Sequence, residues 1–187
     1  TVLFLVAFLI YNDGIQTVIA TAGIYIEEEL DLDTEVTVAV VLLVQEVAFV
    51  GALLLDRLAG RWGAKRVILG SLVAWTGILV FAYGIPAGSP GPGCVLAAAL
   101  GLVLGGSQAL SRSLFSQLIP RDREAEYFSF YEISERGTSW LGTASFSLVY
   151  GLTGSYRSAI LVLIVFFVVG GGLLVLVRAR KSVVEGK

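Results

Sequence analysis

Long apolar runs separated by short polar segments make up most of this chain of 187 residues. Six runs reach the length of about 20 residues that a helix needs to cross a bilayer core about 30 Å thick. They are expected to form helices at about 1–25, 36–56, 65–85, 94–118, 126–150 and 157–177. The alternation of polar and apolar residues that marks a membrane-spanning barrel is absent. The pattern predicts an all-α integral membrane protein, with residues 1–187 forming a single domain of six transmembrane helices.

Composition agrees with this prediction and narrows the possible chemistry. Hydrophobic residues make up 56% of the chain and charged residues 15%, against about 45–50% and about 25% in soluble domains. A lipid bilayer is therefore the expected surrounding, and the net charge of −2 gives no sign of nucleic-acid binding. With one cysteine, Cys94, and no histidine, the chain lacks the commonest metal ligand and general base. We expect neither an enzyme nor a metal or cofactor site.

The sequence contains no methionine and opens directly on an apolar run. It has neither the basic start nor the small-residue cleavage site of a signal peptide. We therefore expect a fragment or a processed product of a longer protein.

Basic residues predict the orientation of the helices. They follow the second, fourth and sixth predicted helices: Arg57, Arg61, Lys65, Arg66, Arg121, Arg123, Arg178, Arg180 and Lys181. The opposite connections hold an acidic cluster at 27–35, an uncharged segment at 85–93 rich in glycine and proline, and Arg157. Because basic connections stay in the cytoplasm, both termini are expected to be cytoplasmic.

Charged residues also lie inside the first, second, fourth and fifth predicted helices, whereas the third and sixth have none between their ends. The order charged, charged, uncharged therefore occurs twice, as inverted repeats of three helices would produce. A charge at the bilayer centre costs about 3 kcal/mol on insertion scales. We expect the four charged helices to line a cavity and the other two to face lipid.

In the first helix, Asp13, Gln16 and Thr17 recur at a spacing that places a carboxylate, an amide and a hydroxyl on one face near mid-span. They are candidate ligands for a proton or a solute, and a structural ion pair is the alternative for Asp13. Asn12 and Gly14 flank the aspartate and favour local unwinding of this helix.

In the second helix, Glu46 has apolar neighbours three and four residues away and Gln45 beside it. It is a candidate for reversible protonation, and a pair with an arginine of another helix is the alternative. In the fourth helix, Gln108 and Arg112 share a side with glycines that permit close helix contact.

The fifth helix carries Glu132, Glu135 and Arg136, at a depth that matches Arg112. We expect an ion pair of Arg112 with Glu132 or Glu135. Such a pair either holds the cavity wall together or exchanges partners with an anionic or zwitterionic substrate, for which the guanidinium group is suited.

Residues 58–66, LAGRWGAKR, resemble the cytoplasmic signature loop of the major facilitator superfamily, written G-x-L-A-D-R-x-G-x-K-R. Gly60 stands where that family has its aspartate, and an aspartate stands one helical turn earlier, in place of the family's first glycine. The resemblance implies a cytoplasmic gate, supported by Asp56, Arg57, Arg61, Lys65 and Arg66.

A second resemblance is more specific. The runs GGSQALSRSLF at 105–115, LIPR at 118–121 and EAEYF at 124–128 are similar to the vacuolar amino-acid effluxer-like permeases, the autophagy-related branch of the superfamily. YNDG at 11–14 and FYE at 130–132 also resemble that family. The resemblance implies helices seven to twelve of a twelve-helix secondary transporter, alternating access between two halves, and amino-acid efflux.

Two other interpretations stay open. The chain could be a membrane scaffold or assembly protein that transports nothing, or a six-helix half-transporter that works as a homodimer. The expected partners are the lipid bilayer, a small-molecule solute, and either the missing N-terminal half or a second copy of the chain. The membrane is the cytoplasmic membrane in a bacterium and the vacuolar membrane in a fungus.

Overall fold

The computed structural model describes residues 2–30, 34–86, 90–119, 123–136 and 140–177. The regular elements in these ranges are all helices: α1 Val2–Leu30, α2 Thr34–Trp62, α3 Ala64–Gly84, α4 Pro90–Leu118, α5 Glu124–Arg136, α6 Trp140–Thr153 and α7 Tyr156–Leu176. Five of the described helices are long and apolar enough to cross a membrane. The predicted all-α transmembrane fold is confirmed.

The fifth predicted helix, at 126–150, includes residues 137–139, which lie outside the described residues. On either side of them the structure describes α5 and α6, of 13 and 14 residues. The sequence between them is Gly-Thr-Ser, and these residue types favour helix ends over helix interiors. Neither helix reaches the length of about 20 residues that a single crossing requires.

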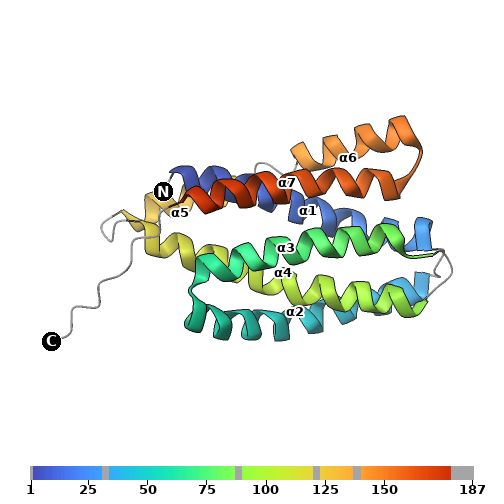
Figure 1. The fold of residues 1–187 in the computed structure, drawn as a ribbon, viewed down its shortest axis with the longest axis horizontal. Helices are drawn as coiled ribbons and strands as arrows, with labels where there is room; N and C mark the ends of the chain where they lie inside the picture. The colour runs from blue at the N-terminus through green and yellow to red at the C-terminus, as the bar shows by residue number, and fades with distance from the viewer. Residues whose placement is uncertain (1, 31–33, 87–89, 120–122, 137–139, 178–187) are drawn as a thin grey trace.

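The helices pack in two groups, which Figure 1 shows one above the other. In one group α2 packs along α4, and α3 contacts both; in the other α1 packs along α7, which also contacts α6. The main contact between the groups joins α3 to α7, the two spans that carry no charge between their ends. Each group therefore contains helices from both of the predicted three-helix repeats.

Glycines bring the backbones of α2 and α4 into direct contact. A Cβ atom on Gly101 would lie 2.6 Å from the Val44 carbonyl oxygen, and one on Gly105 would collide with the Ala48 carbonyl. Gly51 of α2 has the same relation to Leu102 of α4. Close packing through small residues is a main source of helix association in lipid, where the hydrophobic effect gives no drive. The predicted role of the α4 glycines in helix contact is confirmed.

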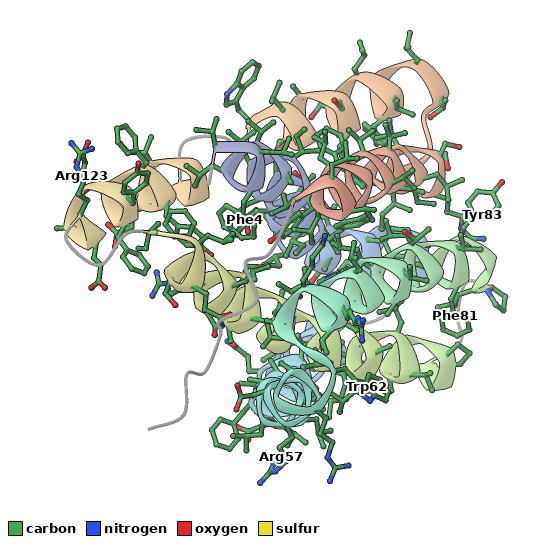
Figure 2. The ribbon with its side chains drawn as sticks, turned by 60° about the vertical axis from the view of Figure 1, so that its left-hand side comes forward. Phe4, Arg57, Trp62, Phe81, Tyr83 and Arg123 are labelled. Atoms are coloured by element: carbon green, nitrogen blue, oxygen red, sulfur yellow. The ribbon has the colours of Figure 1, made fainter. Side chains whose placement is uncertain are left out.

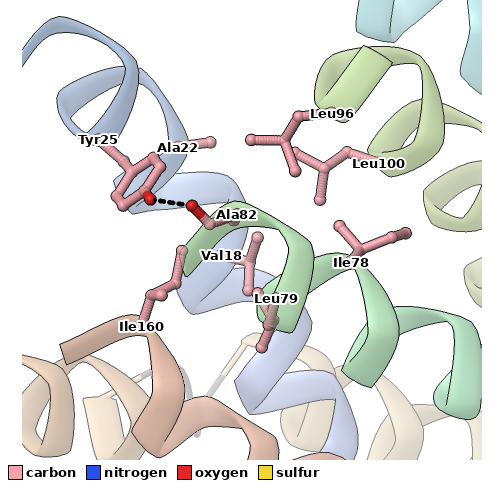
Figure 3. A pocket seen from close by; sticks show the side chains of 9 residues that line it. All are labelled: Val18, Ala22, Tyr25, Ile78, Leu79, Ala82, Leu96, Leu100 and Ile160. Carbon is pink, nitrogen blue, oxygen red and sulfur yellow. Dashed lines mark hydrogen bonds between the residues drawn. The ribbon is translucent and has the colours of Figure 1, made fainter. Parts of the chain in front are cut away.

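Aromatic side chains hold the two groups together. Trp75 of α3 stacks on Phe167 of α7, with ring centroids 5.5 Å apart, and its Nε1 donates to Ser107 Oγ of α4 at 3.2 Å. The Tyr25 hydroxyl of α1 donates to the Ala82 carbonyl of α3 at 2.5 Å. This last bond borders a small apolar cavity of about 10 Å³ (Figure 3). The few polar groups at this boundary therefore have partners, as low-dielectric surroundings require.

The turn between α2 and α3 and the start of α5 lie at the end of the bundle where α1 begins and α7 ends (Figure 1), and these segments carry basic residues. Figure 2, in which this end comes forward, shows Arg57 of α2 and Arg123 projecting outward. The chain turns sharply here, because α2 ends at Trp62 and α3 begins at Ala64. Gly63 between them has φ +88°, a conformation that glycine adopts without strain.

Candidate functional site

Asp13 lies buried in the middle of α1 and contacts the first turn of α6. Its Oδ2 accepts a hydrogen bond of 2.5 Å from the Gly142 backbone N–H. The Thr17 hydroxyl, one turn further along α1, donates to the Asp13 carbonyl at 2.8 Å. A Cβ atom on Gly142 would collide with that hydroxyl and lie 3.1 Å from Asp13 Oδ2. The carboxylate thus contacts the first described turn of α6 from the middle of a membrane span.

α1 runs unbroken through this region, so the expected unwinding at Asn12 and Gly14 is wrong. Gly14 serves packing instead, because a Cβ atom there would lie 3.0 Å from Phe166 Cβ and 3.2 Å from the Phe167 ring on α7.

An aromatic cluster joins α1, α4 and α5 near the basic end. Its rings stack or meet edge to face, with centroids 4.3 to 6.3 Å apart, and belong to Phe4, Phe8, Tyr11, Phe115, Phe128 and Tyr131. The guanidinium carbon of Arg112 lies 5.9 Å from the Tyr131 ring centroid, in cation–π geometry. Arg112 of α4 therefore contacts α5 at Tyr131, the residue that precedes Glu132.

Exchange of Arg112 with a carboxylate stays a prediction. Glu132 is exposed on α5, and the side chains of Glu135 and Arg136 lie outside the described residues. Gln108, one turn before Arg112 on α4, is half-buried, as is Gln16 on α1.

Serines of α4 connect the aromatic residues to the backbone, a role that sequence reasoning missed. The hydroxyls of Tyr11 and Ser111 are 2.6 Å apart, and Ser111 in turn donates to the Ser107 carbonyl. The Ser111 proton is therefore engaged, and Tyr11 is the donor. Ser107 receives the Trp75 N–H and donates to Val103 of its own helix. Tyr11, Ser107 and Ser111 lie in the runs that carry the family resemblance, whereas Trp75 does not. The resemblance was therefore the signal in the sequence that pointed to these residues.

Gln45 and Glu46 are exposed on the outer face of α2. Only 11% of the most apolar window of this helix is buried, the smallest share among the five long helices. Gln45 also borders a largely apolar cavity of about 170 Å³ between α1, α2 and α4. The Glu46 carboxylate lies near the middle of the span, on a face that the described helices leave uncovered.

Four of the five residues expected at the cytoplasmic gate are exposed: Asp56, Arg57, Arg61 and Arg66. The segment differs from the predicted loop, because α2 continues to Trp62 and carries residues 56–61 on its last turns. No proline precedes Gly63 in this helix, and a single glycine, Gly60, does not end it.

Lys65, the fifth of these residues, contacts another helix of the same bundle. Its Nζ donates to the carbonyl oxygens of Val175 and Val177, at 2.8 and 2.6 Å. These carbonyls lie at the C-terminal end of α7, where backbone acceptors have no partner within the helix and a cation is favourable. Lys65 thus ties the α2–α3 turn to α7.

Lys65→Met should therefore loosen the end of α7. The two donated hydrogen bonds contribute about 0.5–1.5 kcal/mol each, so amide hydrogen exchange should accelerate in the last turn of α7 but not at its start, where Ser155 caps the helix. Arg66→Met, at the exposed neighbouring position, is the control. Equal rates of amide exchange in Lys65→Met and Arg66→Met would contradict this role of Lys65 at the end of α7.

The described charged groups inside the spans do not converge on one cavity. Asp13 turns inward to α6, Glu46 outward from α2, and Arg112 toward α5. The predicted site is thus divided into a buried contact and an outer polar surface.

The long apolar helices and the charges within them define a class, that of polytopic helical membrane proteins. Within it, the chain belongs to the family described as "Vacuole effluxer Atg22 like", whose model matches residues 1–187. This family is one of transporters rather than enzymes.

Named relatives agree with this assignment. The chain is 30% identical over 180 residues to "Uncharacterized MFS-type transporter YxiO" of Bacillus subtilis (strain 168), covering 96% of the chain and 41% of the relative. It is 32% identical over 190 residues to "Autophagy-related protein 22" of Yarrowia lipolytica, covering 96% of the chain and 32% of that protein. The chain thus spans less than half the length of these relatives.

Proposed function

We propose that this chain forms one wall of a secondary transporter that moves a small solute, with amino-acid efflux as its activity. The polar groups of the spans that are exposed or half-buried would line the path: Gln45, Glu46, Gln108, Arg112 and Glu132. The opposite wall would come from further helices, either an N-terminal six-helix half or a second copy of the chain.

The uncovered face of α2 is the observation that carries the proposal. Glu46 lies 12 residues from the start of this helix and is exposed there, whereas a carboxylate at bilayer depth requires water or protein beside it. Lipid can satisfy neither its charge nor the Gln45 amide. A second wall with water between would do so, and the additional length of the relatives leaves room for one.

The proposed orientation rests on the basic end of the bundle. Arg57, Arg61, Lys65, Arg66 and Arg123 gather there, and α1 begins and α7 ends at the same place. By the positive-inside rule this end would be cytoplasmic. The Lys65 tie would then steady α7 beside the proposed gate.

Transport by the full-length protein tests the proposal. In reconstituted vesicles supplied with labelled amino acids, Glu46→Gln and Arg112→Ala should each reduce transport at least about tenfold, the effect of losing about 1.4 kcal/mol of interaction. The thermal unfolding of the two variants should stay near that of the wild type. Glu27→Gln, an exposed carboxylate near the end of α1, is the matched control. Wild-type transport in both variants would reject the assignment.

A double substitution distinguishes a transport role from a structural pair. Neutralising Arg112 and Glu132 together, as Arg112→Gln with Glu132→Gln, removes both charges without leaving either unpaired. If they serve only each other, the double variant should recover folding and activity. If the substrate uses them, folding should survive and transport should not.

A further inference from the structure

The Asp13 carboxylate in the middle of α1 contacts the beginning of α6. Backbone N–H groups in the first turn of a helix have no partner within it, and one of these, on Gly142, donates to Asp13 Oδ2. Asp13 is 1% exposed, and its Oδ1 is buried with no hydrogen-bond partner in the described part of the chain. Half of a buried charged group is therefore unsatisfied, which is costly in low-dielectric surroundings.

We propose that Asp13 is a proton-binding site and a latch between α1 and α6, so that a proton on Oδ1 releases α6. The inference rests on the proposed transport function and supplies its coupling ion. The step is a reversible proton transfer from a hydronium ion to Oδ1, which leaves a neutral carboxyl group and one water molecule. No other covalent bond changes.

The packing around Asp13 favours a proton over a metal ion. Metal cations that prefer oxygen ligands take several of them at once, yet Oδ1 is the one atom of this contact left without a partner among the described residues. The contact is closely packed on the Oδ2 side, because even a methyl group on Gly142 would collide with the Thr17 hydroxyl. A proton needs no further ligands.

Protonation weakens the contact for two reasons. The carboxylate loses its attraction to the positive end of the α6 dipole, and the hydrogen bond from Gly142 loses its charge assistance. α6 has few buried residues, which are Gly142 and Phe146, and its ring contacts join Phe146 and Tyr150 to Tyr156 of α7, whereas Leu148 and Leu152 are exposed. Elements with few buried contacts are those that move first.

The charged groups described on the neighbouring helices do not contact the Asp13 carboxylate. The sequence of α6 contains none, and its tyrosine, Tyr150, stacks on Tyr156 of α7. The described charged side chains on the other helices that pack against α1 are Glu35, Glu46, Asp56, Arg57 and Arg61 of α2, Arg112 of α4, Glu124, Glu126 and Glu132 of α5, and Arg157 of α7. All of them are exposed except Arg157, which is half-buried in the first turn of α7, and Arg112 lies over the Tyr131 ring. On α1 itself, Tyr11 bonds Ser111, and Glu27 is exposed more than three turns away.

Spin-label distances in the full-length protein test the latch. With Cys94→Ser, labels at Leu148→Cys on α6 and Val73→Cys on α3 report the position of α6, since both sites are exposed. Lowering the pH should convert a latched distance into a released one. Asp13→Asn should show the released distance at every pH, with the latched fraction at alkaline pH reduced about tenfold. A pH response that persists in Asp13→Asn would overturn the proposal.

A second variant tests the latch without altering the carboxylate. Gly142→Ala should push α6 off Asp13 and give the released distance at every pH. Adding Thr17→Ala removes the colliding hydroxyl and should restore the pH response. Gly151→Ala, on the same helix with nothing within 4 Å of the added atom, should behave as the wild type. A wild-type response in Gly142→Ala would overturn the proposal even if Asp13→Asn fails to fold.

Transport measurements separate this latch from the function on which it rests. A pH gradient should drive transport in the wild type, and Asp13→Asn should lose at least about tenfold of it while still exchanging solute at equal pH. Dependence on sodium instead of pH would overturn the proton site. If no labelled amino acid is carried but α6 still responds to pH through Asp13, the proposed function fails and the latch stands.

Discussion

Trp75→Ala should lower the free energy of unfolding by about 3 kcal/mol, the lower end of the range for buried tryptophans in soluble cores. Trp75 is 1% exposed, stacks on Phe167 and donates to Ser107, so it connects three helices at the boundary between the two groups. The value stays at the lower end because lipid reduces the transfer contribution, leaving lost packing contacts as the main cost. The indole also borders the 170 Å³ cavity, which its removal would enlarge.

Thermal unfolding in detergent, followed by helical circular dichroism, measures this effect. Each kcal/mol should lower the melting temperature by about 2–4 °C for a chain of this size. Trp62→Ala is the matched control, since that indole is 62% exposed at the end of α2 and should change stability little. Trp75→Phe should fall between, because it retains ring stacking and loses the hydrogen bond. Equal melting of Trp75→Ala and Trp62→Ala would show that the boundary is held by other contacts.

Gly105→Ala should separate α2 from α4, which are the most extensively packed pair of helices. The added Cβ would collide with the Ala48 carbonyl and lie 2.9 Å from its carbon, both backbone atoms that cannot rotate away. Overpacking costs about 1–3 kcal/mol and occasionally more, and the rigid neighbour places this substitution at the upper end. The same loss should follow Gly51→Ala on the facing helix.

Gly77→Ala controls for the change of residue type. Nothing lies within 4 Å of a Cβ atom at that position, and alanine is favoured over glycine in helices by about 1 kcal/mol. The control should therefore melt at or above the wild-type temperature, whereas Gly105→Ala melts well below it. A stabilising effect of Gly105→Ala would mean that α2 and α4 are less closely packed than the glycine contacts indicate.

Apolar length determined the spans, because each crossing must satisfy its own backbone over the thickness of the bilayer. The predicted limits of the third and sixth helices lie within one residue of α3 and α7. For the fifth span, apolar length predicts one helix across residues 137–139, whereas the Gly-Thr-Ser sequence there favours helix ends. Length alone could not decide between one helix and two.

The sequence by itself determined the membrane class, the family and the presence of a buried carboxylate, because hydropathy, motif and the cost of a charge in lipid are local properties. The tertiary structure decided what each polar group faces. Asp13 and Gly142 are 129 positions apart, and no periodicity within α1 indicates a partner on another span. The same holds for Lys65 with Val177 and for Trp75 with Ser107. Helix packing determines these partners, because it depends on small residues and ring contacts from several spans at once.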